Sequence, residues 1–465
     1  MTDPVEAPEP PRRARMRRTA QRLNGLARRH GPTAPIWRRR AAILTGAILL
    51  GLAALLFAHA ADWASGVFLR LSRRWRWAPM IATPAGFALL VWLTRRVAPD
   101  ARGSGIPQIM AARLDPEGAM RSLASARTAI VKFGMTLAAL LLGASVGREG
   151  PTVQISATIM AYCHRLFRVP VTASVMVAGG AAGVAAAFNT PLAGVTFAIE
   201  ELASAYDQKM TLLVMTAVLI SGMVSLGLAG DYVYFGAMTD VVSVRQALTL
   251  VPVAGVLGGL AGGVFSRLML AFATAELPVM AALRRRPVAV AAVAGIVVAL
   301  LGCGTGMTWG TGYEPARLII TGSSAPWWFG PAKFGATLAT AVSGLPGGIF
   351  APSLAVGAGL GDLLRLLFPG TGVGAVALLG MTAYFTGVVR APLTAVVIIS
   401  EATASRGLLL PLLATALIAD WVAGMISRER LYHGLSRAFM PKSDQRRADM
   451  GGSPASSLAA PARLA

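Results

Sequence analysis

The chain has 465 residues, of which 55% are hydrophobic and 14% are charged, and it carries a formal net charge of +22. A soluble protein usually contains about a quarter charged residues. The composition therefore argues against a soluble globular protein and indicates an integral membrane protein. The excess positive charge then has to be explained by its place in the chain.

Much of the positive charge precedes the first apolar segment, in "PRRARMRRTAQRLNGLARRHGPTAPIWRRR". We expect residues 1–40 to form a basic cytoplasmic tail, because Lys and Arg accumulate on the cytoplasmic side of membranes and meet anionic lipid there. A second basic loop, at 283–290, is expected on the same side. The cluster "RLSRRWRW" at 70–77 is expected on the opposite side, against this rule. Because the arginines border membrane segments, no nucleic-acid partner is expected.

Long apolar segments follow the tail, at residues 41–60, 127–146, 171–199, 211–229, 248–273, 287–303, 373–399 and 407–427. Each approaches or exceeds the roughly 20 residues that a helix needs to cross a bilayer. We therefore expect an all-α, multi-pass membrane protein. Abundant Gly, Ala, Ser and Thr in these segments favour close helix contacts. The first apolar segment starts too late and is too long for a cleavable signal peptide.

Neither a disulfide, a metal site nor a cofactor is expected. Cys163 and Cys303 lie in apolar segments and are interpreted as small buried side chains. The histidines are scattered and form no metal-ligand motif; they are His30, His59, His164 and His433. No nucleotide-binding loop, zinc helix or nucleophile motif supports an intramembrane enzyme.

The sequence contains an internal repeat. The stretch "KFGMTLAALLLGASVGREGP" at 132–151 aligns without a gap to "KFGATLATAVSGLPGGIFAP" at 333–352, a shift of 201 positions. The same shift pairs Pro191 with Pro392 and Glu200 with Glu401. We expect a transmembrane domain over 41–440, with repeat halves of about 41–230 and 247–440, and a short polar tail over 441–465. Transporters use such repeats, often inverted, to build a midplane site from broken helices.

Three short loops share a pattern of glycine followed by proline: "GSGIP" at 103–107, "GREGP" at 147–151 and "GIFAP" at 348–352. Glycine permits close backbone approach, and proline is favoured in the first turn of a helix. Each loop is therefore predicted to lead into a helix whose free N–H groups face a small anion. Partial charges suit an ion that must also leave. The alternative is that these residues only pack and break membrane helices.

The three loops, in this order, resemble the anion-site motifs of the CLC family of chloride channels and chloride/proton antiporters. The resemblance extends through "FNTPLAGVTFAIEE" at 188–201 and "LYHGLSRA" at 431–438. It implies the CLC fold, in which two inverted halves form one pore in each subunit of a homodimer. The tail is too short for cytoplasmic CBS domains, which implies a prokaryotic member in the bacterial inner membrane, with both termini cytoplasmic.

The resemblance also implies residue roles. The hydroxyl groups of Ser104 and Tyr432 would contact chloride, and the backbone of Ile349 and Phe350 would complete the site. Glu149 would be the external gating glutamate, which occupies an anion position as a carboxylate and swings away when protonated. The other loop residues implied at the anion path are Gly105, Ile106, Arg148 and Gly150. Two simpler interpretations stay open: Arg148 as the ion-pair partner of Glu149, and Tyr432 as an interfacial aromatic side chain.

The stretch "FAIEE" bears on the transport mode. Antiporters of the family commonly carry a second glutamate here, which receives cytoplasmic protons, whereas many channels carry valine. Glu201 therefore implies chloride/proton exchange, with a passive chloride channel as the alternative and a solvated acid as the other interpretation of Glu201. Glu200 is expected to be structural, because Glu401 is its repeat mate. Ser104 implies chloride, because nitrate-preferring members often carry proline there.

Overall fold

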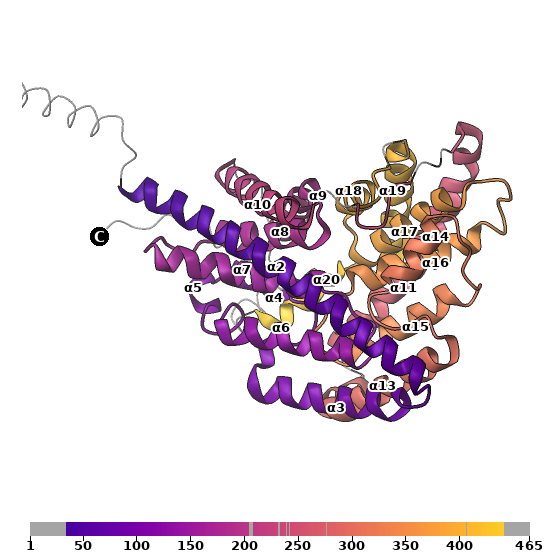
Figure 1. The fold of residues 1–465 in the computed structure, drawn as a ribbon, viewed down its shortest axis with the longest axis horizontal. Coiled ribbons are helices and arrows are strands. Elements are labelled where there is room, and N and C mark those ends of the chain that lie inside the picture. The colour runs from indigo at the N-terminus through magenta and orange to yellow at the C-terminus, as the bar shows by residue number, and fades with distance from the viewer. Residues whose placement is uncertain are drawn as a thin grey trace, which may run out of the picture.

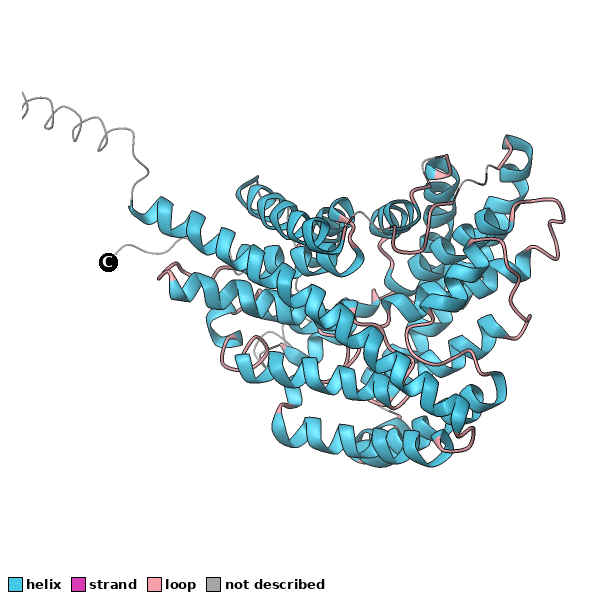
Figure 2. Cartoon of the chain, viewed as in Figure 1, coloured by secondary structure: helices cyan, strands magenta, loops and turns pink. Residues whose placement is uncertain are grey.

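The computed structural model describes residues 34–203, 208–230, 233–238, 240, 242–275, 277–405 and 407–440. Within these ranges the chain is helical and contains no strand (Figure 2), which confirms the expected all-α architecture. The expected polar tail, 441–465, lies outside the described residues, as does the expected basic tail up to residue 33.

The helices of the first half are α2 (Ala34–Arg74), α3 (Pro79–Val97), η1 (Pro99–Ala101), α4 (Ile106–Ala112), α5 (Pro116–Ala119), α6 (Ala126–Leu141), α7 (Glu149–Leu166), α8 (Ala173–Phe188), α9 (Pro191–Phe197), η2 (Ala198–Leu202) and α10 (Gln208–Ala229). Those of the second half are α11 (Val244–Thr274), α12 (Pro278–Arg285), α13 (Pro287–Thr305), α14 (Tyr313–Ile320), α15 (Phe329–Val342), α16 (Phe350–Leu364), α17 (Val373–Val389), α18 (Pro392–Thr403), α19 (Leu409–Ile426), α20 (Leu431–Ser436) and η3 (Arg437–Phe439).

Five helices of the described chain are long and apolar enough to cross a membrane: α2, α10, α11, α13 and α19. The longest, α2, has 41 residues and therefore a length of about 60 Å, which exceeds the hydrocarbon core of about 30 Å. Basic residues lie at both of its ends, Arg38–Arg40 at one and Arg73–Arg74 at the other. A crossing by α2 would place these two clusters on opposite sides of the membrane.

Two of the expected crossings are each broken into two helices, so the expectation of one continuous helix for 171–199 and for 373–399 is wrong. The chain turns at Asn189 (φ 56°) and at Arg390 (φ 61°), which both adopt the left-handed conformation. Pro191 and Pro392 then begin the next helices, α9 and α18. Proline cannot continue a helix because it lacks an N–H group, but it fits the first turn.

Helix starts repeat along the chain with the shift found in the sequence. The pairs α7 and α16, α9 and α18, and α10 and α19 each begin 201 residues apart. Figure 1 shows α7 to α10 on one side of the molecule and α14 to α19 on the other, with α20 between them. Helix α3 of the first half packs against α13 of the second.

Glycines permit the closest helix contacts in the second half. A Cβ atom at Gly262 of α11 would lie 2.5 Å from the carbonyl oxygen of Tyr384 in α17, and one at Gly258 would lie 2.3 Å from the Cβ of Ala383. The two backbones approach closely because neither position carries a side chain. Helix α17 also packs against α16, which begins at the candidate site.

Candidate anion and proton site

The three Gly–Pro loops meet, as the sequence predicts. Gly147 and Gly348 exchange backbone hydrogen bonds of 2.7 and 2.8 Å, and the N–H of Gly347 donates to the carbonyl of Gly103 at 3.1 Å. Helices α4, α7 and α16 begin within these stretches, at Ile106, Glu149 and Phe350. The first N–H groups of a helix have no acceptor within it, so three positive helix ends are gathered in one region.

Glycine is required where the loops touch. A Cβ atom at Gly150 would lie 2.3 Å from the Oγ of Ser104, and one at Gly105 would lie 2.6 Å from the carbonyl oxygen of Gly150. The N–H of Gly105 donates to the Oε1 of Gln108 at 3.0 Å, so it is not among the free N–H groups at the start of α4. Gly105 therefore contributes space, and Ile106, fully buried, provides the start of α4.

Two buried hydroxyl groups face each other beside these loops. The hydroxyl of Tyr432 at α20 is oriented toward that of Ser104, yet neither forms a hydrogen bond of ordinary geometry with any described residue. Tyr432 is fully buried, so the interpretation as an interfacial aromatic is wrong. Its ring lies 5.9 Å from that of Phe350, the first residue of α16. Buried polar groups normally have partners, so this pair is suited to a polar ligand.

Glu149, the first residue of α7, is also fully buried. Its carboxylate faces the N–H groups of Glu149 itself and of Ala351 in α16, but within the described chain neither oxygen forms a hydrogen bond of ordinary geometry. The interpretation of Arg148 as its ion-pair partner is wrong. The Nη1 of Arg148 instead contacts Asp62 at 2.8 Å and the carbonyl of Ala58 at 2.7 Å, both in α2.

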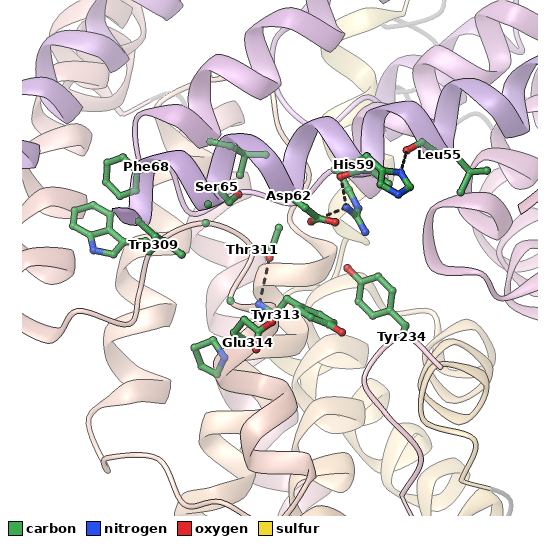
Figure 3. Close-up of a pocket in the computed structure, with 18 of the residues that line it drawn as sticks. Leu55, His59, Asp62, Ser65, Phe68, Tyr234, Trp309, Thr311, Tyr313 and Glu314 are labelled. Atoms are coloured by element: carbon green, nitrogen blue, oxygen red, sulfur yellow. Dashed lines mark hydrogen bonds and ion pairs between the residues drawn. The ribbon is translucent and has the colours of Figure 1, made fainter. Parts of the chain in front are cut away.

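A cavity of about 690 Å³ opens at Arg148; we call it the Arg148 cavity. Figure 3 shows His59 and Asp62 on one wall, along α2, with Tyr234 and Tyr313 facing them. The guanidinium of Arg148 lies 5.9 Å from the centre of the Tyr234 ring. Arg148, which lines this cavity, immediately precedes Glu149 in the sequence.

A second cavity, of about 380 Å³, is lined by Ser104, Ile349 and Tyr432; we call it the Tyr432 cavity. Arginines also line it: Arg95, Arg102 and Arg284. Basic walls raise the local concentration of anions. The hydroxyl pair therefore faces a basic cavity, whereas Glu149 follows Arg148, which lines the other cavity.

Glu201 lies in the π-helical turn η2 and is fully buried. The interpretation as a solvated acid is therefore wrong. π-Helical turns often mark functional positions, and here the turn points two adjacent carboxylates at different partners. Glu200 accepts hydrogen bonds from the N–H groups of Leu393 and Thr394, whereas the Nδ1 of His433 lies 3.6 Å from the carboxylate of Glu201.

Sequence reasoning missed two buried lysines that hold the cavity loops. The Nζ of Lys132 donates to the carbonyl of Gly103 at 2.7 Å, and that of Lys333 donates to Thr308 and Gly310 at 2.9 and 2.7 Å. Both lysines begin the repeated "KFG" sequence. This repetition of a charged residue within an apolar segment was the available signal of their structural role. Gly103 lines the Tyr432 cavity and Gly310 lines the Arg148 cavity.

Both cysteines are free thiols, but only Cys163 is buried as expected. Cys303 is half-buried, and its Sγ–H donates to the carbonyl of Arg76 at 3.3 Å. Within the described ranges, His, Cys, Asp and Glu form no group of three or more that could hold a metal ion.

The comparisons with known proteins agree with this geometry. The family model described as "Voltage gated chloride channel" matches residues 86–424. The chain belongs to this family, the CLC family. Family members include proteins named H(+)/Cl(-) exchange transporter ClcA, from Yersinia pestis bv. Antiqua (strain Angola) and Yersinia pseudotuberculosis serotype O:3 (strain YPIII). Each is 32% identical over 441 residues, covering 86% of this chain and 87% of the relative.

Solved CLC structures have the same fold. A slow cyanobacterial Cl-/H+ antiporter matches with a TM-score of 0.73 and 25% identity, over 88% of this chain and 99% of that one. A eukaryotic CLC transporter matches with a TM-score of 0.69 and 26% identity, over 86% of this chain and 74% of that one. The predicted resemblance to the CLC family and the predicted helical CLC fold are confirmed.

Proposed function

We propose that this protein exchanges chloride for protons across a membrane. The names of the ClcA relatives and the cyanobacterial antiporter of the same fold support this activity. The observation that carries the proposal is that Ser104, Tyr432 and Glu149 present buried oxygen atoms without a hydrogen-bond partner of ordinary geometry. Ser104 and Tyr432 line the Tyr432 cavity, and Glu149 follows Arg148, which lines the Arg148 cavity. An unpaired buried polar group costs about 1–3 kcal/mol, which a chloride ion or a transferred proton would offset.

In this proposal, chloride binds to the hydroxyl groups of Ser104 and Tyr432 and to the first N–H groups of α16, at Ile349 and Phe350. Ile106 starts α4 and Gly150 lies in the first turn of α7, the other two helices that face the ion, and Gly105 leaves the space for it. The guanidinium of Arg148 is paired with Asp62, so Arg148 acts on the ion through the field of the Arg148 cavity. The site holds the anion by partial charges, which permits rapid release.

Glu149 is proposed as the gate. Its carboxylate competes with chloride for the N–H groups at the start of α16, because both are small anions attracted to a helix N-terminus. A proton that binds to the carboxylate neutralises it and removes that competition. The proton therefore moves with the change in anion occupancy, and this links the two fluxes.

Glu201 is proposed as the proton acceptor on the other side. We place the Arg148 cavity outside and the Tyr432 cavity on the cytoplasmic side of the bacterial inner membrane, with both termini cytoplasmic and one pore in each subunit of a homodimer. The proton route through Glu201 and the chloride route through the Tyr432 cavity then reach the cytoplasm separately, so that the two routes diverge there. An ionisable residue buried within a membrane protein is functional by default.

The test uses proteoliposomes containing the purified protein, with a chloride gradient imposed and proton movement recorded by a pH electrode. We expect uphill proton movement in the wild type, its loss in Glu201→Gln, and continued chloride flux in that variant. Glu117→Gln, on an exposed residue of α5, is the matched control. The description of the family as channels makes a passive chloride channel the second candidate, and chloride flux without proton movement in the wild type would establish it.

A further inference from the structure

We propose that His433 is the residue through which protons pass between the aqueous phase and Glu201. This inference rests on the proposed exchange of chloride for protons and adds a residue to its proton route. The side chain of Glu201 is 0% exposed, so it cannot take a proton directly from bulk water, whereas that of His433 is 40% exposed. The two side chains therefore form a step from solvent into the protein.

The geometry suits proton transfer. The Nδ1 of His433 lies 3.6 Å from Oε1 of Glu201, slightly beyond hydrogen-bond distance. Neither the Nδ1 nor the carboxylate oxygens of Glu201 have a hydrogen-bond partner of ordinary geometry within the described residues. A small rotation of the exposed imidazole brings the atoms into contact. Catalytic hydrogen bonds are commonly long in a resting structure and shorten during turnover.

The other charged groups around Glu201 do not provide such a step. Arg430, before α20, and Arg113, after α4, act on its carboxylate through space. Their own hydrogen bonds, however, go to the backbone carbonyls of Glu200 and Leu202. Guanidinium groups stay protonated, so they cannot relay a proton. Glu200 caps α18.

Two further charged residues lie near His433 in the chain but are bound to each other. Glu429 and Arg437 form an ion pair of 2.8 Å. An imidazole can both accept and donate a proton at its ring nitrogens, which distinguishes His433 from these neighbours. Tyr432, the preceding residue, lines the Tyr432 cavity together with Ser104. Helix α20 thus brings the proposed proton step and the proposed anion site to adjacent residues.

The step balances. Protonated His433 transfers the proton on Nδ1 to the Glu201 carboxylate, so that an N–H bond breaks and an O–H bond forms. The imidazole becomes neutral, with its remaining proton on Nε2 and Nδ1 vacant. Because Nδ1 is buried in this structure, a rotation of the half-exposed ring brings it to water, where it takes the next proton. Reversal of these events releases a proton from Glu201 when transport runs in the other direction.

The experiment measures proton and chloride fluxes together in proteoliposomes for the wild type, His433→Asn and His433→Ala. We expect proton flux to fall by about tenfold or more in both variants, as for loss of a proton-transfer group, while chloride flux persists. Imidazole added on the side of residue 433 should restore proton flux in His433→Ala, which a merely structural role of His433 would not allow. Arg437→Gln, which removes a nearby charge without removing a relay, should behave as the wild type.

The outcomes separate the two proposals. A wild type that shows chloride flux without proton movement overturns the proposed exchange and, with it, the role of His433. A wild type that couples the two fluxes, together with unchanged proton flux in His433→Asn, overturns the role of His433 alone. Reduced flux that imidazole fails to restore, or an equal loss in Arg437→Gln, also overturns it, because the effect then lies in local structure or charge.

Discussion

Glu200 and Glu401 stabilise helices in opposite halves of the chain. Glu200 accepts hydrogen bonds from the N–H groups of Leu393 and Thr394 at 3.2 and 2.7 Å, at the start of α18. Glu401 accepts hydrogen bonds from Leu192 and Ala193 at 3.1 and 2.8 Å, at the start of α9. Both glutamates and both helix starts are 201 residues apart. The contacts are therefore reciprocal, as expected for two repeats related by a local two-fold axis.

The first prediction concerns this pair. Glu200→Ala and Glu401→Ala should each lower the free energy of unfolding by about 1 kcal/mol, because each leaves two helix N–H groups without their carboxylate acceptor. Thermal unfolding in detergent measures the effect. Glu117→Ala, at an exposed position of the short helix α5, is the control. Equal melting temperatures for all three variants would show that the reciprocal contacts contribute nothing.

The second prediction concerns the contact between two loops. Gly150→Ala should weaken chloride binding and lower the free energy of unfolding by about 1–3 kcal/mol, because its Cβ would lie 2.3 Å from the Oγ of Ser104. Gly134→Ala in α6 is the matched control, since no atom lies within 4 Å of the added Cβ. Calorimetric titration with chloride measures the affinity. Wild-type affinity in Gly150→Ala would place the anion elsewhere.

The third prediction compares the buried lysines. Lys132→Met should reduce chloride affinity by about tenfold, the effect of losing a buried hydrogen bond worth 1–2 kcal/mol, because the carbonyl of Gly103 loses its 2.7 Å donor beside Ser104. Lys333→Met removes the corresponding bonds at Thr308 and Gly310. It should lower stability without a comparable loss of affinity. Equal losses of affinity in the two variants would contradict the assignment of the anion to the Ser104 loop.

The fourth prediction concerns the ion pair in the Arg148 cavity. Asp62 is 71% exposed at its side chain and Arg148 only 7%, so Asp62→Asn should change stability by at most about 1 kcal/mol. The cavity loses one negative charge, so its potential becomes more positive, and chloride uptake from that side should become faster at low ionic strength but not at high ionic strength. Initial chloride fluxes at two salt concentrations measure this. An acceleration that persists in high salt would point to a change of shape instead.

Much of the candidate site could be predicted from the sequence because its loops carry their own backbone requirements. Glycine and proline in "GSGIP", "GREGP" and "GIFAP" specify close approach followed by a helix start, and the structure has helix starts at these loops. The breaks at Asn189 and Arg390 were missed because the hydrophobic pattern runs through them. The proline two residues after each break was the available signal.

Other features depend on contacts that no local pattern encodes. Arg148 lies beside Glu149 in the sequence, yet its partner Asp62 is 86 positions earlier, in α2. The sequence likewise gives no indication that the Gln108 side chain uses the N–H of Gly105. His433 lies 3.6 Å from Glu201 only because α20 returns to the first half of the fold.

The central claim, exchange of chloride for protons, is tested most directly by the voltage at which net proton flux reverses. Potassium and valinomycin set the membrane voltage of proteoliposomes that carry fixed chloride and pH gradients, and proton flux is recorded at each voltage. Exchange predicts a reversal voltage that depends on both gradients and moves when either one is changed. A reversal voltage that follows the pH gradient alone, or the absence of proton flux at every voltage while chloride crosses, would contradict it.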